Sequence, residues 1–434
     1  MSTKILGDSG VLYTDRRDFY ISPYVVKELW TDVAPFTTLV ANRGTMTPPD
    51  PIFKMFEHRA GWIKQEFIVN SAIPGTMNAS DSGVEQPSGG YVPVDGATGV
   101  SLDNSLVGLE CEVWDTTKTT KKGVVLITSY SSGVKGKVLS GTDVVLADND
   151  VFVVIGNAQG EASSSPEAFS DELQVVWNST QIFRTPVEIS GTLLAAALRG
   201  ERNELARLRD LKSKEHKIQK ERAFLFGLSP LGIGAGADTF NDNVFKTDAA
   251  GKKVRATTGI ISALQKYGTS SGDYQNLFTI SAALYDYGKF VDDMEKVFLA
   301  GVTYNSGEKY AFCGPGAMSY WSKLATGNTF SGKSGWNVQI SATQKDNLGF
   351  NVRILETPHG ILKLVPTPVL RDMYSKTMLI VSDENLQHVQ YRPAMFHANI
   401  KTDNNPDLVK DEFMSDEGVG ITMLESHKLV TITA

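Results

Sequence analysis

The feature that most constrains the fold of this sequence is a long helical segment near the middle of the chain. From Thr192 to Phe226 there is no proline and only one glycine, Gly200, and strong helix formers fill most positions. The polar sequence Ser190-Gly191-Thr192 is a helix start signal. At 1.5 Å per residue, a helix over these 35 residues is about 50 Å long. We therefore predict one continuous helix, much longer than the usual three or four turns.

The predicted helix has a narrow apolar seam and a charged remainder. Leu198 and Leu205 fall in one heptad phase. Leu211, Ile218 and Leu225 fall in another, which argues against a coiled coil. A helix of this kind bridges space or leans on a flat neighbour. The alternative is a solvated amphipathic helix of an ordinary domain.

The basic residues of this helix form a candidate charged face. The whole chain has a net charge of −7, so contact with nucleic acid requires a local basic surface. Nine Lys and Arg stand against five Asp and Glu between residues 199 and 222. This excess can contact phosphates without reading sequence, or it can neutralise acidic neighbours in an assembly, which we favour; the two roles are compatible. The candidate basic face comprises Arg199, Arg202, Arg207, Arg209, Lys212, Lys214, Lys217, Lys220 and Arg222.

The remaining composition indicates a globular protein without a recognisable active site. The chain has 434 residues, enough for two or three cores, and 41% of them are hydrophobic. Cys111 and Cys313 are the only cysteines, which excludes a disulfide framework and a cysteine-based zinc site. The six histidines form no HExxH or HxH pair, and there is no GxSxG sequence. We therefore predict no enzyme activity, no metal and no cofactor.

Targeting and membrane signals are also missing from the sequence. The first twenty residues have no apolar signal-peptide core. No run approaches the roughly 20 apolar residues that span a bilayer. We expect a protein that is made in the cytoplasm and has no contact with a membrane.

Residues 1–51 are predicted to form an extended arm with one short helix that begins near Pro23. The arm is rich in aromatic residues, among them Tyr20 and Trp30. Such side chains favour an arm that wraps a neighbouring subunit. The alternative is a tail folded onto its own core.

Residues 52–70 are predicted to form a two-stranded ribbon that turns near Arg59-Ala60-Gly61. Charged and aromatic residues alternate along both strands, as in a protein–protein interface. The alternative is an edge hairpin of a larger sheet. The candidate inter-subunit contacts on the ribbon are Phe56, Glu57, Arg59, Trp62, Lys64, Glu66 and Phe67.

Residues 80–167 have the composition of an inserted β-rich domain. Segments rich in Gly, Ser and Asn flank them on both sides. Short strand candidates recur about every ten residues between turn signals, which favours a small antiparallel barrel or sandwich. The strand candidates are 109–114, 123–130, 136–139, 143–146 and 151–156.

The rest of the chain is predicted to be mixed α and β. Strands at 172–177 and 182–189 lead into the long helix. An amphipathic helix is expected over 281–299, and Cys313 is expected as a small buried thiol in a strand. Later strands are expected at 350–356, 361–365, 378–381, 420–425 and 428–433.

The order of these parts resembles the Hong Kong 97-type major capsid protein of tailed bacteriophages. The most telling stretch is NSTQIFRTPVEISGT, followed by the helix with ERNELARLRDLKSKEHKIQKERAFLFG. The segments ETPHGILKLVPTPVL, MLIVSDENLQHVQYRP and GITMLESHKLVTIT are similar to the late strands of that family. The resemblance covers most of the chain outside residues 80–165.

The resemblance implies an α+β capsid fold and a structural role. The chain would assemble into hexamers and pentamers of an icosahedral head that encloses double-stranded DNA. Its partners would be scaffold, portal and decoration proteins, and its location the virion capsid, assembled in the host cytoplasm. The implied parts are an N-terminal arm (1–51), an E-loop (52–79 and 168–189), the inserted domain (80–167), a peripheral domain with the spine helix (190–255 and 371–434) and an axial domain (256–370).

Two alternative functions stay open at this point. One is a receptor-binding or decoration protein of a virion, in which the inserted domain contacts a receptor. The other is a shell subunit of a bacterial nanocompartment with the same fold, although such a subunit ordinarily lacks so large an insert.

Overall fold

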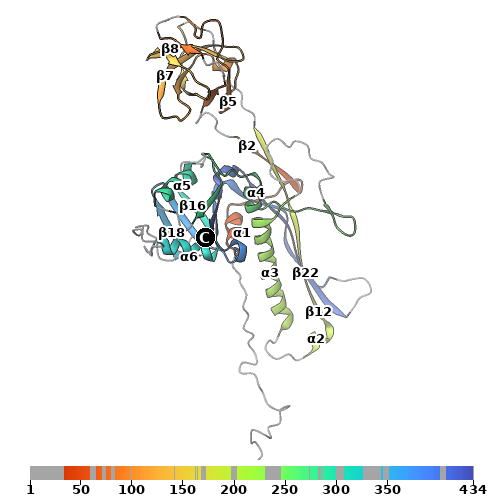
Figure 1. Ribbon diagram of the computed structural model, residues 1–434. Coiled ribbons are helices and arrows are strands. Elements are labelled where there is room, and N and C mark those ends of the chain that lie inside the picture. The colour runs from red at the N-terminus through yellow and green to blue at the C-terminus, as the bar shows by residue number, and fades with distance from the viewer. Residues whose placement is uncertain are drawn as a thin grey trace, which may run out of the picture. The chain divides into compact units, whose positions relative to one another are not determined.

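The computed structural model describes most of the chain from residue 34 onward, as two compact units. Segments outside the described residues are 1–33, 59–64, 71–74, 80–83, 168–172, 197–202, 230–245, 282–284, 300–306, 326–343, 346–350, 401–406 and the single residues 99, 141, 162, 164, 273, 286 and 434. The smaller unit is His58–Gln174, and the larger combines Val175–Ala434 with the chain up to Glu57. The predicted α+β class is confirmed, because helices and strands both build the larger unit (Figure 1).

In the larger unit a long helix, α3, packs on one face of a four-stranded sheet (Figure 1). Strand β12 pairs antiparallel with β22 over its whole length. Side chains alternate between buried and exposed along β12, and the buried Phe183 and Thr185 lie against α3. The elements are α3 (Glu204–Phe226), β1 (Thr45–Met46), β21 (Leu386–His397), β22 (Leu408–Ile421) and β12 (Gln181–Ser190), with strand order β1–β21–β22–β12.

The prediction of one continuous helix over 192–226 is wrong. The predicted start is correct: Ser190 caps α2 (Gly191–Ala195), and its Oγ accepts from the backbone N–H of Leu193 at 3.3 Å. Helix α2 then ends because Ala196 has an extended backbone, with ψ of 135°. Asn203 starts a separate helix, since its side chain accepts from the N–H of Ala206 at 3.1 Å. The resulting α3 has 23 residues and is about 35 Å long.

A seven-stranded mixed sheet forms the other half of the larger unit. Neighbours β15 and β23 run parallel, as do β16 and β19, while the remaining pairs are antiparallel. Its strands in sheet order are β15 (Leu277–Ser281), β23 (Lys428–Thr433), β20 (Thr377–Val381), β16 (Glu308–Cys313), β19 (Gly360–Pro366), β18 (Asn351–Thr357) and β17 (Gln344–Lys345). The other elements of this unit are α1 (Pro35–Asn42), α4 (Ile260–Tyr267), α5 (Tyr287–Leu299), α6 (Pro315–Ala325), β13 (Lys246–Thr247), β14 (Lys253–Val254), η6 (Asp372–Tyr374), η7 (Asp383–Asn385) and η8 (Leu424–Ser426).

The seven-stranded sheet lies between two hydrophobic cores. Alternation along β16 directs Phe312 into one core, with residues of α1, α3 and α4, and Ala311 and Cys313 into the other, with residues of α5 and α6. Cys313 is a buried thiol, as predicted. The strands predicted in 350–365, 378–381 and 428–433 are confirmed. The helix predicted over 281–299 begins only at Tyr287, because Ser281 still belongs to β15.

The prediction that the two strands of residues 52–70 pair with each other is wrong. The first strand, β2 (Ile52–Glu57), pairs with β11 (Gln174–Ser179) of the larger unit. The second, β3 (Glu66–Val69), pairs with β5 and β10 inside the smaller unit. Alternation alone identified both segments as strands, but it does not specify the partner of a strand.

The smaller unit is a closed antiparallel barrel, one of the two architectures predicted for the insert. Val92, two residues before the start of the edge strand β5, bridges to Val134 on the opposite edge strand β8, so the sheet closes on itself. The sheet order is β5 (Val94–Thr98), β3, β10 (Val151–Asn157), β6 (Leu109–Trp114), β7 (Lys121–Tyr130) and β8 (Val134–Ser140), with β4 (Thr76–Met77) paired to β9 (Val144–Val145) and a turn η4 (Asn104–Leu106). Strands β3 and β4 pair within this unit, which therefore extends beyond the predicted 80–167.

A core substitution in the barrel tests this corrected boundary. The Phe67 ring is fully buried and stacks on Phe152 at 4.9 Å between ring centroids. Phe67→Ala should lower the free energy of unfolding by about 3–5 kcal/mol, because it removes a buried ring and leaves a cavity. Chemical denaturation of the whole chain measures this loss. The matched variant Phe56→Ala, at a ring that is 71% exposed, should change it by less than about 0.5 kcal/mol. Equal effects would contradict the assignment of β3 to the barrel core.

Candidate assembly site along the long helix

Strand β22 carries four carboxylates that the fold buries. Asp411, Glu412, Asp416 and Glu417 are all at most 9% exposed. Buried carboxylates are costly unless cations and hydrogen bonds compensate them. The residues around β22 must therefore supply cations and hydrogen bonds to these four carboxylates.

Cations from four neighbouring segments reach these carboxylates. From α3, Arg209 Nε donates to Asp411 at 2.8 Å. From β12, Arg184 donates to both oxygens of Glu412, at 2.6 and 2.9 Å. Arg255 reaches Asp416 at 3.0 Å, and Arg392 of β21 reaches the same carboxylate at 3.3 Å. The acidic strand is thus held from the helix and from both flanking strands.

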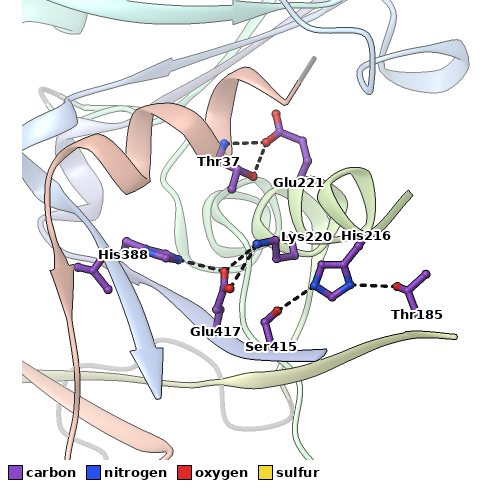
Figure 2. A network of polar contacts seen from close by, with 9 residues as sticks. Thr37, Thr185, His216, Lys220, Glu221, His388, Ser415 and Glu417 are labelled. Atoms are coloured by element: carbon purple, nitrogen blue, oxygen red, sulfur yellow. Dashed lines mark hydrogen bonds and ion pairs between the residues drawn. The ribbon is translucent and has the colours of Figure 1, made fainter. Parts of the chain in front are cut away.

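Glu417 lies at the centre of a buried network between α3 and the sheet, shown in Figure 2. Lys220 Nζ donates to its two oxygens at 3.3 and 3.2 Å, and His388 Nε2 lies 3.1 Å from Oε2. Burial alone would raise the pKa of Glu417, but the hydrogen bond with His388 and the charge of Lys220 hold it below its usual value. His388 Nδ1 lies 3.1 Å from Thr45 Oγ1, so the network also reaches β1.

His216 joins the helix to two strands through both ring nitrogens (Figure 2). Nδ1 lies 3.0 Å from Thr185 Oγ1 on β12, and Nε2 lies 3.1 Å from Ser415 Oγ on β22. Burial lowers the pKa of this imidazole, with a further contribution from the nearby Lys220 charge. A neutral ring between two hydroxyls fits this site, because a hydroxyl can donate or accept as the tautomer requires.

Glu221 of α3 supplies the cap that α1 lacks. Ala34, at the N-cap position, makes no side-chain cap, and Pro35 starts the helix. Instead Glu221 accepts from the N–H groups of Phe36 and Thr37 at 3.0 and 2.7 Å, and from Thr37 Oγ1 at 2.6 Å (Figure 2). Burial raises the pKa of this carboxyl group. The free N–H groups at the start of α1 are thereby satisfied from a distant helix.

Most described members of the predicted basic face form ion pairs within the chain. Arg209 and Lys220 bind β22, whereas Arg207, Lys212 and Lys214 pair along α3 itself. These five basic residues therefore neutralise acidic residues of their own chain, whereas the prediction favoured acidic neighbours in an assembly. Lys217 and Arg222 are exposed, and Arg199 and Arg202 lie outside the described residues.

The predicted inter-subunit contacts divide into four groups. Phe56 is strongly exposed on β2, consistent with a contact surface. Phe67 and Glu57 are buried by their own chain, and Glu57 Oε1 accepts from the N–H of Met423 at 2.6 Å, so the prediction is wrong for both. Glu66 pairs with Lys118 at 2.7 Å within the barrel. The candidates Tyr20, Trp30, Arg59, Trp62 and Lys64 lie outside the described residues.

One stretch of the sequence indicates the buried network. DEFMSDE, residues 411–417, places four carboxylates in a strand, where Asp and Glu are depleted. Within the described residues, no group of three or more His, Cys, Asp or Glu side chains is arranged to hold a metal ion. None of the described helices is long and apolar enough to cross a membrane.

Comparisons with known proteins give a match to one family. A family model described as SU10 major capsid protein matches residues 45–407. The sequence matches none of the curated proteins with which it was compared.

Several solved structures are distantly similar to this chain. One is the holo-SrpI encapsulin complex from Synechococcus elongatus PCC 7942, at 8% identity over 61% of this chain and 77% of that chain, with a TM-score of 0.38. The capsid of a native GTA particle is similar at 11% identity over 64% and 80%, with a TM-score of 0.39. Mycobacterium phage Patience is similar at 10% identity over 64% and 77%, with a TM-score of 0.38.

Removal of Lys220 tests the buried network. Lys220→Met leaves Glu417 buried without its main cation, so we expect a loss of about 3 kcal/mol in the free energy of unfolding. The pKa of Glu417 is lower in the folded chain than its value of 4.5 in the unfolded chain, so ionised Glu417 stabilises the fold above pH 4.5. This stabilisation is lost as the pH falls from 4.5 through the pKa of the folded state. Because the variant raises that folded pKa, its acid unfolding should begin at higher pH.

The matched control for this prediction is Lys212→Met on the same helix. Lys212 pairs with Glu215 on the surface, and its loss should cost less than about 1 kcal/mol. Denaturant titrations at several pH values measure both variants. Similar losses for the two would mean that the network does not stabilise the packing of α3.

Proposed function

Because this chain belongs to the SU10 major capsid protein family, we propose that its copies form hexamers and pentamers that close an icosahedral phage head around double-stranded DNA. The chain is a major capsid protein, a component of the virion capsid with a structural and not an enzymatic role. The observation that carries the proposal is the family match, which spans residues 45–407 and so includes the barrel, α3 and every strand of the two sheets of the larger unit except β22 and β23.

Each part of the subunit has a proposed place in the shell. The four-stranded sheet with α3 corresponds to the peripheral domain, and the seven-stranded sheet with α4–α6 corresponds to the axial domain. The paired strands β2 and β11 form the base of the E-loop. Element order supports this division, since a strand feeds the long helix, the mixed sheet follows, and the last strands return to both sheets.

The barrel, residues 58–174, is proposed to lie on the outer surface of the shell. It contains 7 Lys and Arg against 15 Asp and Glu, a net charge of −8 in a chain whose total is −7. The rest of the chain is therefore close to neutral. An acidic domain is repelled by packaged DNA, which is a dense polyanion, so the exterior is its favourable side.

Further partners are part of the same proposal. The family resemblance supports a separate scaffold protein, a portal and decoration proteins, with assembly in the host cytoplasm. Contact with DNA is proposed to be non-specific. It draws little on α3, because five of its basic residues already pair within the chain.

Assembly is the direct test of this proposal. The chain, expressed with a candidate scaffold protein, should form megadalton shells in negative-stain microscopy and light scattering. A stable monomer or trimer under all assembly conditions would contradict the proposal. It would favour the alternative of a receptor-binding or decoration protein.

Phe56 on β2 is the exposed aromatic that we expect to contact a neighbouring subunit. Phe56→Ala should lower the yield of closed shells at least about tenfold, since a buried aromatic anchor dominates many interfaces. The melting temperature of the unassembled subunit should stay unchanged. The control Val145→Ala, at a barrel residue that is 61% exposed, should assemble normally. Normal shell yield from Phe56→Ala would refute the contact.

A further inference from the structure

A short connection joins the two sheets of the larger unit. Strand β22 of the four-stranded sheet ends at Ile421, and β23 of the seven-stranded sheet begins at Lys428. Between them Met423 has φ of 47°, a left-handed conformation that a non-glycine residue rarely adopts. Its N–H donates to Glu57 Oε1 at 2.6 Å. The crossing between the sheets is therefore bent at Met423 and is fixed there by the hydrogen bond to Glu57 of β2.

Three basic side chains are buried at this crossing. His427 and Lys428 are fully buried, and Lys309 of β16 is only 3% exposed. Lys309 Nζ donates to the carbonyl oxygens of Val297 and Ser426, at 2.8 and 3.2 Å. Lys428 Nζ donates to the carbonyl of Gln275 at 2.6 Å. We name His427, Lys428 and Lys309 the basic joint.

The basic joint lacks the compensation that buried cations normally receive. Among the described residues, both lysines donate only to neutral carbonyls and form no ion pair with a carboxylate. The other charged groups that act on the joint are Lys296 of α5, which opposes its protonation, and Glu425 of η8, which favours it. Lys296 Nζ itself donates to Gln275 Oε1 at 3.3 Å. Positive charge thus exceeds negative charge in a buried site, an arrangement that favours the neutral bases.

Burial accordingly lowers the pKa of all three side chains. Burial, with the charges of Lys309 and Lys428, lowers the pKa of His427 to about 3. Burial lowers the pKa of Lys428 to about 7, with a contribution from Lys309, and that of Lys309 to about 8. Each base therefore binds a proton more weakly inside the closed joint than it does in water.

We propose that the basic joint is a proton-responsive hinge between the two sheets of the subunit. Opening admits water to the three bases, and each then takes up a proton at its ordinary pKa. Lower pH therefore favours the open joint. The lysines contribute between their ordinary pKa of 10.5 and their lowered values, and His427 contributes between 6.5 and about 3.

Opening would release a small and defined set of hydrogen bonds. Asn276 Nδ2 donates to the carbonyls of Leu424 and His427, at 2.8 and 3.0 Å. The N–H of Leu429 donates to the carbonyl of Asn276 at 2.7 Å. These bonds tie the start of β23 to the start of β15. Hydrogen exchange of the backbone amides at the start of β23, such as Leu429, therefore reports whether the joint is open. Both sheets contribute to one hydrophobic core, among other residues through Phe312 of β16 and Val419 of β22, so the opening is local to this crossing.

Hydrogen exchange of the full chain tests the hinge through His427. After correction for intrinsic exchange, the opening constant of peptides that contain His427–Thr433 should rise by about tenfold per pH unit below pH 6. His427→Asn, whose carbonyl can still accept from the N–H of Ser382, should remove this slope. The control His359→Asn, at an exposed histidine, should keep it. A flat profile in the unmodified protein, or an unchanged slope in His427→Asn, would overturn the proposal.

The lysines give an independent test at neutral pH. Lys428→Met keeps the shape of the side chain without its charge, so opening at pH 7.5 should fall by at least about tenfold. The control Lys266→Met, at an exposed lysine, should leave opening unchanged. If Lys428→Met fails to fold, as judged by protection of α3 amides, Lys309→Met tests the same cluster. Opening at the normal level in the folded variants would contradict a role for the lysines.

Discussion

The packing of the larger unit depends on the neutralisation of one acidic strand. Four carboxylates between Asp411 and Glu417 of β22 are buried, and each must face a cation in the folded chain. Arg209 and Lys220 of α3, Arg184 of β12, and Arg255 and Arg392 supply those cations. A shift of α3 by one turn, about 5.4 Å, would separate these pairs. The charges therefore fix the register of the helix on the sheet.

This interaction explains why the long helix has so weak an apolar seam. The sequence-based interpretation attributed its charges to other subunits or to nucleic acid, because a narrow seam usually indicates a bridging helix. In the structure, part of the charged face of α3 packs against the sheet, where Arg209 and Lys220 pair with carboxylates of β22. The existence of the helix and its Ser190 start were predictable from local residues, but its interruption was not. The run of good helix formers indicated neither the extended backbone at Ala196 nor the new helix start at Asn203.

Long-range contacts account for what sequence reasoning missed. Glu221 caps α1 from a position 184 residues away from Thr37, so nothing near either residue indicates the contact. Strand β3 was correctly identified as a strand, yet its partners could not be read from alternation, and Phe67 was therefore placed on a surface when it fills the barrel core. The barrel strands were located well, since each is short and bounded by turn residues. The family, suggested by the order of elements, is confirmed by the match over 45–407.

A double-mutant cycle between Arg209 and Asp411 tests the central claim most directly. The Arg209 guanidinium is partly exposed and Asp411 is fully buried, with 2.8 Å between the paired atoms. Unfolding free energies of Arg209→Met, Asp411→Asn and the double variant give the coupling between the two side chains. If charge pairing on β22 fixes the helix, the coupling should be favourable by more than about 1 kcal/mol. A coupling near zero would contradict this account and leave apolar contacts as the sole determinant of the packing of α3.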